Sequence, residues 1–338
     1  MDRSSLGIYR QAFASRFPSL MQEAKQPRFR APLALWTIAA FLASPAAMTK
    51  DEHGKPDLQG MWTGGTLTPF ERPPQLANKP FLTATELAEH QRQSAERFWK
   101  AGHNPADVGR DNDAFLDSDM KILPNGQTSL VVQPADGKVP LRPEAERRRD
   151  HNLANFDSYE TMSQWDRCIT RAPTALFPVV YNNAYQIIQS PAQVVIVAEM
   201  IHDARVIPID GSAHVDSRIR SWSGDSRGHW EGDTLVVDTT NFNDQGWIAT
   251  GQNAARIRGV PYSTDLHIVE RFTRANADTL NYEITIDDPQ MYSEPWKLAF
   301  PLTRDDSYQM FEYACHEGNH AMELILRGAR AQEQSDAR

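Results

Sequence analysis

The chain has 338 residues, of which 40% are hydrophobic and 23% charged, and its formal net charge is −9. That length suffices for one large β-rich domain or two smaller ones. We expect no nucleic-acid partner, because binding to phosphates needs a clustered basic surface. The short basic run 147–149 precedes Asp150 directly and fits a solvated helix end.

Residues 1–47 are expected to be a signal peptide with an upstream extension. Basic residues precede the apolar segment 31–43, and a Ser-Pro-Ala sequence ending at Ala46 fits a cleavage site. The apolar segment is shorter than the about 20 residues that a membrane span needs. We therefore expect a periplasmic or secreted protein, cleaved near Ala46, with no membrane span in the mature chain. An uncleaved N-terminal anchor is the alternative.

Residues 48–165 are predicted to form an irregular wrap, since they are rich in Pro and Asp and alternate little. One helix is predicted near 84–101, because Thr83 and Glu86 have the spacing of a capping box. A second short helix is expected at about 143–151.

Residues 166–330 are predicted to form an antiparallel β domain, followed by a disordered tail at 331–338. Short β-branched runs alternate apolar and polar positions and are separated by turn residues, with no helices of βαβ length between them. We expect about eight to ten strands that close into a lipocalin-like (calycin-type) barrel, with a β-sandwich as the alternative. The expected strands include Tyr185–Ile188, Val194–Ile201, Arg205–Ile209, Thr234–Thr239, His267–Arg274, Thr279–Ile286, Trp296–Leu302 and Tyr308–Cys315.

The chain has two cysteines, Cys168 and Cys315. In a secreted protein this count predicts one disulfide. Two free thiols in a reducing compartment are the alternative.

The segment 311–320 is the densest cluster of chemically active side chains. If Tyr308–Cys315 is a strand, Glu312 and His316 lie on one face and Cys315 on the other. Such a Glu–His pair can transfer protons, because the carboxylate orients the imidazole. His202 is expected on the apolar face of the preceding Val194–Ile201 strand. For both histidines the alternative is a structural side chain satisfied by hydrogen bonds.

The stretch 222–230 combines aromatic and polar side chains and is expected to border a small-molecule pocket. We assign Asp225 to catalysis. The expected substrate-binding residues are Trp222 and Arg227 from this stretch, together with Tyr181 and Asn182, which lie earlier in the chain. A structural turn capped by Asp225 is the alternative. The Gly-Asp-Ser run lacks the Gly-x-Ser-x-Gly pattern, so a serine hydrolase of that type is rejected.

No metal site and no cofactor are expected. The histidines and acids lack zinc-ligand spacing, and no dinucleotide-binding fingerprint is present. If a metal were bound, His202, Asp203, His316 and Glu317 would be its ligands.

Several motifs occur in order along nearly all of the mature chain. They are Pro56–Trp62 (PDLQGMW), Tyr181–Asn183, Glu199–Asp203 (EMIHD), Gly224–Val237 (GDSRGHWEGDTLVV), Glu270–Arg274 and Glu312–Asn319 (EYACHEGN). Together they resemble a large uncharacterised family of secreted bacterial proteins. The resemblance implies a common fold and a signal peptide, but no activity. It also implies that His229 and His320 are poor candidates for essential groups, because the family accepts other residues there.

The predicted function is a periplasmic or secreted enzyme that uses acid/base chemistry in hydrolysis, elimination or isomerisation. Its expected substrate is a hydrophobic or aromatic small molecule. The alternative is a non-catalytic periplasmic protein that binds a lipid or another small molecule.

Overall fold

The protein is described here by a computed structural model that covers residues 50–102, 120–155, 157–173, 176–179, 181–248 and 259–337. The expected signal segment, residues 1–47, lies outside the described residues. No helix in the described ranges is long and apolar enough to span a membrane.

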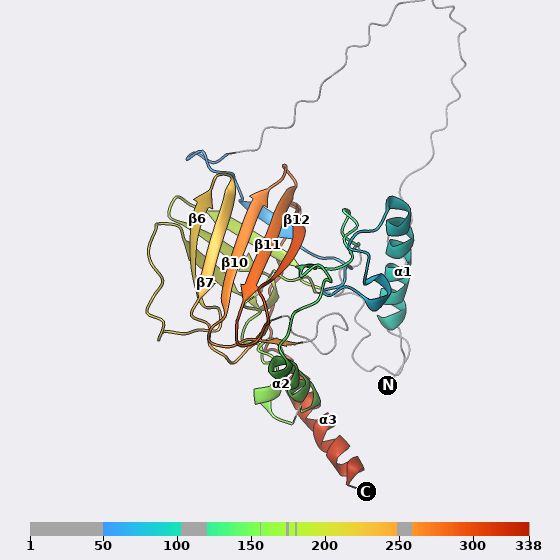
Figure 1. Ribbon diagram of the computed structural model, residues 1–338. Coiled ribbons are helices and arrows are strands. Elements are labelled where there is room, and N and C mark those ends of the chain that lie inside the picture. The colour runs from blue at the N-terminus through green and yellow to red at the C-terminus, as the bar shows by residue number, and fades with distance from the viewer. Residues whose placement is uncertain are drawn as a thin grey trace, which may run out of the picture. The chain divides into compact units, whose positions relative to one another are not determined.

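The protein is mainly β, and its main sheet is antiparallel throughout (Figure 1). Hydrogen bonds connect nine strands in the order β5-β4-β3-β1-β12-β11-β10-β7-β6, and β2 pairs with β12 beside this path. A two-stranded ribbon of β8 and β9 is separate. The strands are β1 (Gly60–Thr63), β2 (Val131–Gln133), β3 (Ala184–Gln189), β4 (Gln193–Ala198), β5 (Ala204–Pro208), β6 (Asp225–Glu231), β7 (Thr234–Thr240), β8 (Trp247–Ile248), β9 (Val260–Pro261), β10 (His267–Arg274), β11 (Thr279–Asp287) and β12 (Trp296–Arg304).

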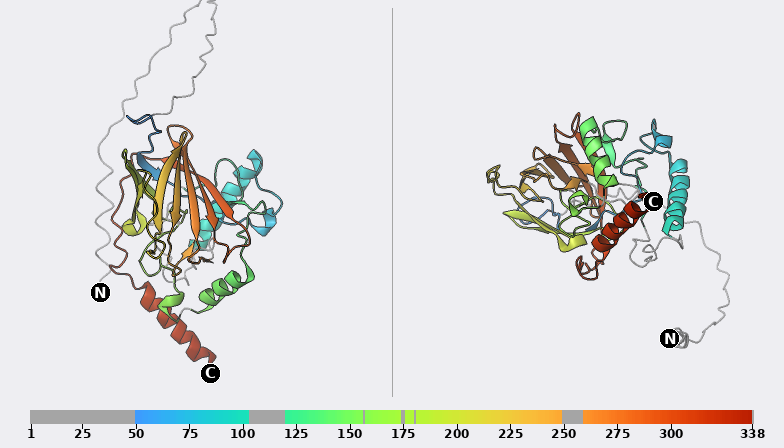
Figure 2. Two further views of the ribbon diagram at one scale, coloured as in Figure 1. Left: turned by 60° about the vertical axis from the view of Figure 1, so that its left-hand side comes forward. Right: turned by 90° about the horizontal axis from the view of Figure 1, so that it is seen from below.

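The two ends of the strand path, β5 and β6, meet and nearly close a barrel. At this seam Gly228 leaves room for two side chains of the β5 edge. A Cβ at Gly228 would lie 2.7 Å from Cγ2 of Ile209 and 2.9 Å from Cγ2 of Ile207. The curl of the sheet can be followed in Figure 2. One continuous sheet of this kind bears out the predicted barrel architecture and disfavours the β-sandwich.

Strand alternation fills the barrel interior with large side chains. On β11 the alternating apolar residues are buried: Leu280, Tyr282, Ile284 and Ile286. Aromatic rings from other strands join this core, and the Tyr282 ring lies 5.0 Å from that of Phe272. Burial of each such side chain contributes about 1.5–3 kcal/mol, so the interior is a packed core.

One ion pair crosses this apolar interior. Arg205 on β5 donates from both terminal nitrogens to Glu270 on β10, at 2.6 and 2.9 Å. The hydroxyl of Tyr282 donates to the same carboxylate at 2.8 Å. The pair therefore ties together two strands that do not share a hydrogen-bonded ladder.

The part of the chain that the structure describes contains three α-helices beside the barrel: α1 (Ala84–Gly102), α2 (Pro143–Ala154) and α3 (Ala321–Asp336). The capping box at α1 is confirmed, because the Thr83 amide donates to Glu86 Oε2 at 2.9 Å and the Glu86 amide donates to Thr83 Oγ1 at 3.4 Å. Short 3-10 turns occur at Pro74–Leu76, Tyr159–Thr161 and Met200–His202. The expected tail 331–338 begins within α3, and the expected wrap contributes β1 and β2 to the sheet.

Glu231 pairs with Thr234, so the β6–β7 hairpin has a two-residue loop, with Gly232 at φ +60°.

The prediction of a strand at Tyr308–Cys315 is wrong, because this stretch is irregular chain. Its backbone bonds locally and to a side chain, since the Phe311 amide donates to Glu199 Oε1 at 3.0 Å. Without a ladder, strand alternation does not apply to residues 308–319, which we call the C-terminal segment.

Candidate active site

Four side chains, two carboxylates and two imidazoles, form a hydrogen-bonded row on the outer face of the barrel. This acid–base row consists of Asp225, His214, Asp238 and His267. His214 Nδ1 is 2.8 Å from Asp225 Oδ2, and His214 Nε2 is 2.9 Å from Asp238 Oδ1. The second oxygen of Asp238 lies 2.7 Å from His267 Nε2. Two carboxylates and two imidazoles thus form one hydrogen-bonded row.

Strand register explains why three of these side chains meet. Asp238 on β7 is paired with Arg227 on β6 and with Val269 on β10. Asp225 lies two residues before Arg227, and His267 lies two residues before Val269. Both are therefore diagonal neighbours of Asp238 on the same face of the sheet. The inward neighbours of Asp238, such as Val237, are buried in the core, which turns Asp238 outward.

His214 comes from the loop between β5 and β6, and this loop has its own anchor. The side-chain amide of Asn241, directly after β7, donates to the carbonyls of Val215, Asp216 and Ile219 at 3.1–3.2 Å. The Val215 amide donates to Asp225 Oδ2 at 3.1 Å. These bonds fix the loop where His214 reaches both carboxylates.

The two ends of the row differ electrostatically. The hydrogen bond to Asp238 raises the pKa of His267 above its ordinary value, and the same bond is the largest cause of the lowered pKa of Asp238. At the other end Arg227 forms an ion pair with Asp225 at 3.1 Å. His214 contacts a carboxylate through each ring nitrogen, so it joins the two acidic side chains.

His267 has the geometry of a general acid or base. Its Nε2 is held by a carboxylate, and its side chain is 42% exposed. No partner for its Nδ1 is found in the described parts of the chain. An imidazole oriented through one nitrogen can exchange a proton with a substrate through the other. The same ranges contain no group of three or more His, Cys, Asp or Glu residues arranged to hold a metal ion.

Two residues expected from the sequence, Asp225 and Arg227, belong to this site. Asp225 does not cap its own turn, because its carboxylate binds His214 and the Val215 amide. Arg227 Nε also donates to the Ala213 carbonyl at 2.9 Å and so supports the loop.

The other expected substrate-binding residues lie outside the row. Trp222 is covered by the guanidinium of Arg167, 5.2 Å from the ring centroid. Tyr181 stacks on Tyr313, with ring centroids 6.4 Å apart. Asn182 bends the chain with φ +52°, a conformation that Asn tolerates.

The expected catalytic group Glu312, His316 and His202 is not brought together as an acid/base pair. All three residues are exposed. His202 lies in the 3-10 turn after β4 with φ +42°, so it does not share the apolar strand face, and its Nδ1 is 3.1 Å from the Tyr313 carbonyl. β4 ends at Ala198, and the polar residue that turns inward there is Glu199.

Glu199 anchors the C-terminal segment from a buried position. The Tyr308 hydroxyl donates to its two carboxylate oxygens at 2.9 and 2.8 Å. The disulfide between Cys168 and Cys315 fixes the same segment covalently, which confirms the predicted pairing. Two of the residues suggested as metal ligands have other surroundings: Asp203 is hydrogen-bonded to Thr170, and Glu317 is exposed.

His214, Asp238, His267 and Asn241 were not identified from the sequence. One signal was present for Asp238, since a carboxylate interrupts the apolar run 235–237 on a strand and must face outward or find a partner. His267 is the first residue of β10 and lies two residues before Val269, the pairing partner of Asp238. Only the strand register shows that His267 and Asp238 are neighbours. His214 carried no local signal.

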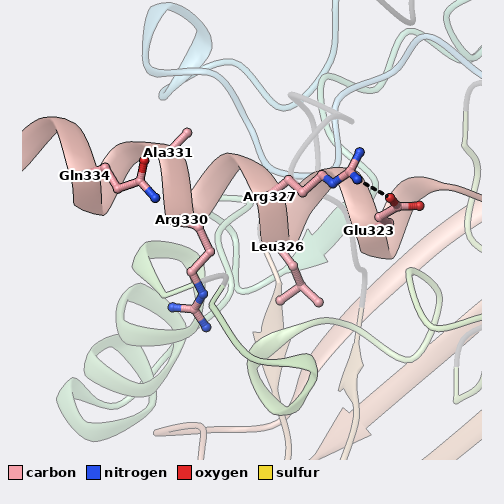
Figure 3. A pocket seen from close by; sticks show the side chains of 6 residues that line it. All are labelled: Glu323, Leu326, Arg327, Arg330, Ala331 and Gln334. Atoms are coloured by element: carbon pink, nitrogen blue, oxygen red, sulfur yellow. Dashed lines mark ion pairs between the residues drawn. The ribbon is translucent and has the colours of Figure 1, made fainter.

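A shallow hollow on α3 is no better candidate. Figure 3 shows its lining, which comes from a single helix face: Glu323, Leu326, Arg327, Arg330, Ala331 and Gln334. Arg327 is paired with Glu323 at 3.0 Å, and Arg330 donates to the Asp157 carbonyl at 3.0 Å. The charged groups that line it are thus already engaged.

Comparison of the chain with protein-family models, curated proteins and solved structures gave no match. The candidate site is therefore supported by its geometry alone.

Proposed function

We propose that the protein is a periplasmic or secreted enzyme that uses acid/base chemistry on a hydrophobic or aromatic small molecule. His267 is the proton-transferring group, and Asp238 orients it. The observation that carries the proposal is the 2.7 Å contact of His267 Nε2 with Asp238, combined with the exposed ring edge. Hydrolysis, elimination and isomerisation all require such a group.

The rest of the row supports proton transfer at His267. Asp238 also contacts His214, whose second nitrogen contacts Asp225. A proton taken up by His267 is thereby stabilised by the carboxylate of Asp238. Replacement of His214 is expected to change the protonation of His267 through the shared Asp238.

The substrate class is supported by apolar side chains on the loop that carries His214. Val215 and Ile219 are 40% and 62% exposed, so they would offer an apolar ligand a contact surface beside His214. We further propose the lipocalin-like (calycin-type) form of the barrel, secretion by the segment 1–47, and membership of the secreted bacterial family that the motifs resemble. The filled interior gives less support to a non-catalytic lipid-binding protein.

The proposal is tested with three probe classes: an aryl ester for hydrolysis, a β-hydroxy carbonyl compound for elimination, and a β,γ-unsaturated ketone for isomerisation. We expect turnover of at least one class and a loss of about 100-fold or more in His267→Gln, as removal of a general acid/base usually gives. His229→Gln is the matched control, because His229 is also an exposed β-strand histidine paired with an acid, Glu231.

The assignment would be overturned if turnover survived in His267→Gln. It would also be overturned if the wild type turned over none of the probes faster than this variant does. Loss in His316→Ala or Glu312→Ala with retention in His267→Gln would instead support the C-terminal segment as the site.

A further inference from the structure

Arg171 is a buried cation with one terminal nitrogen that lacks a hydrogen-bond partner. Its residue is only 6% exposed, and its Nη1 is buried with no hydrogen-bond partner. Its Nη2 donates to the Phe177 carbonyl at 3.4 Å, a long contact. Burial lowers the pKa of the guanidinium. Leaving such a group without acceptors is unfavourable, because a buried charge needs a partner.

The other two arginines buried to this degree in the described ranges, Arg72 and Arg274, are satisfied. Arg72 donates to Thr128 Oγ1 at 3.0 Å and to a backbone carbonyl. Arg274 donates to the carbonyls of Ala277 and Asn276, at 2.8 and 3.1 Å, and to that of Asp57. Arg167 is the other described arginine with a buried nitrogen that lacks a partner, its Nε, but Arg167 as a whole is less buried than Arg171.

No carboxylate of the described residues forms a hydrogen bond or an ion pair with the guanidinium of Arg171, although the charge of Asp166 acts on it. Asp166, on the same segment, accepts a hydrogen bond from Ser163 Oγ at 2.7 Å, and burial raises its pKa. The buried Nη1 of Arg171 therefore has a donor to offer to an acceptor from outside the described chain.

Aromatic side chains surround the guanidinium. It lies 4.7 Å from the ring centroid of Trp165, and the Tyr181 ring is 6.4 Å from that of Trp165. The hydroxyls of Tyr181 and Tyr313 are 3.3 Å apart. Since the two hydroxyls share one hydrogen bond, one O–H remains free to donate. Trp165, Tyr181 and Tyr313 are only partly buried, so this cluster reaches the surface.

We infer that Arg171, with Trp165, Tyr181 and Tyr313, forms a binding site for a small aromatic carboxylate. The carboxylate would accept from the guanidinium, which matches it in geometry, and its ring would pack on the aromatic side chains. The site shares no residue with the acid–base row and does not depend on the proposed function.

The test is calorimetric titration of the whole protein with benzoate, benzamide and acetate at constant ionic strength. We expect saturable binding of one benzoate, no binding of the neutral benzamide, and weaker binding of acetate. Arg171→Met should weaken benzoate binding by about 10- to 100-fold, the range for a charged hydrogen bond. Arg167→Met is the matched control, because Arg167 also stacks on a tryptophan, Trp222, and it should leave affinity unchanged.

A second measurement is the melting temperature without ligand. Because Nη1 of Arg171 lacks a partner, Arg171→Met should melt no lower than the wild type, and benzoate should raise the melting temperature of the wild type alone. No binding to the wild type, as expected if an ordered water fills the position, would overturn the inference. So would equal binding by Arg171→Met, or failure of that variant to fold. Acetate binding as tight as that of benzoate would overturn the aromatic part.

Discussion

The carboxylate of Asp238 holds His267, with Oδ2 2.7 Å from Nε2, and its other oxygen holds His214. This contact raises the pKa of His267 above 6.5 and lowers that of Asp238 below 3.8. Asp238→Asn should therefore shift the pKa of His267 downward. An NMR titration of the His267 ring measures it directly, and the ring of His229 in the same spectra is the control. An unchanged His267 pKa would contradict the role of Asp238.

The same shifts set the sign of a pH-dependent stability term. A histidine whose pKa is raised in the folded state stabilises that state fully below pH 6.5, its unfolded pKa, and this contribution is lost as pH rises through the folded pKa. An aspartate whose pKa is lowered in the folded state stabilises that state above pH 3.8, its unfolded pKa, and this contribution is lost as pH falls through the folded pKa. We expect the His267–Asp238 pair to stabilise the folded protein most between these two pH values. Urea unfolding of the wild type and of His267→Gln at a series of pH values measures the difference between their free energies of unfolding. This difference should become smaller both below and above the pH range of greatest stabilisation.

The ion pair between Arg205 and Glu270 should be costly to break from one side. Arg205→Met leaves the buried Glu270 carboxylate without its cation, and such losses amount to about 3–5 kcal/mol. Adding Glu270→Gln removes the charge but keeps an acceptor for the Tyr282 hydroxyl, so the double variant should recover much of the loss. Denaturant unfolding of both variants tests this. Arg218→Met at the exposed loop is the control, and a double variant no more stable than Arg205→Met would contradict the account.

Gly228 is expected to be required at the barrel seam. In Gly228→Ala the new methyl group would meet Ile209 and Ile207 at 2.7 and 2.9 Å. Overpacking of this kind costs about 1–3 kcal/mol, and Ile209→Ala in the same chain should relieve part of it. Gly328→Ala on α3 is the control, because nothing lies within 4 Å of its added Cβ. The free energy of unfolding is the measurement, and equal values for Gly228→Ala and the wild type would argue against a tight seam.

The disulfide between Cys168 and Cys315 closes a loop with a sequence separation of 147. In the chain-entropy model such a bridge stabilises by about 4–5 kcal/mol. Denatured, non-reduced protein should show no reactive thiol, and reduced protein should show both. Reduction should also lower the melting temperature. Detection of free thiols before reduction would contradict the bridge.

Local patterns in the sequence were sufficient for individual elements. The Thr83–Glu86 spacing predicted the start of α1, because a capping box depends only on residues three apart. Alternation along 280–286 predicted the buried face of β11, because side chains on a strand point to opposite faces. The same logic failed at Tyr308–Cys315, where Tyr308 and Phe311 are held by Glu199 and not by a neighbouring strand.

Composition and short-range pattern thus determined the β-rich class, the helix near 84–101 and the pairing of the two cysteines. Only the tertiary structure decided which polar groups meet. His214, Asp238 and His267 come from a loop and two strands, and their contacts depend on strand register and on the loop path fixed by Asn241. The missing partner of Arg171 is likewise invisible along the chain, because a side chain's hydrogen bonds depend on what folds around it and not on its neighbours in sequence.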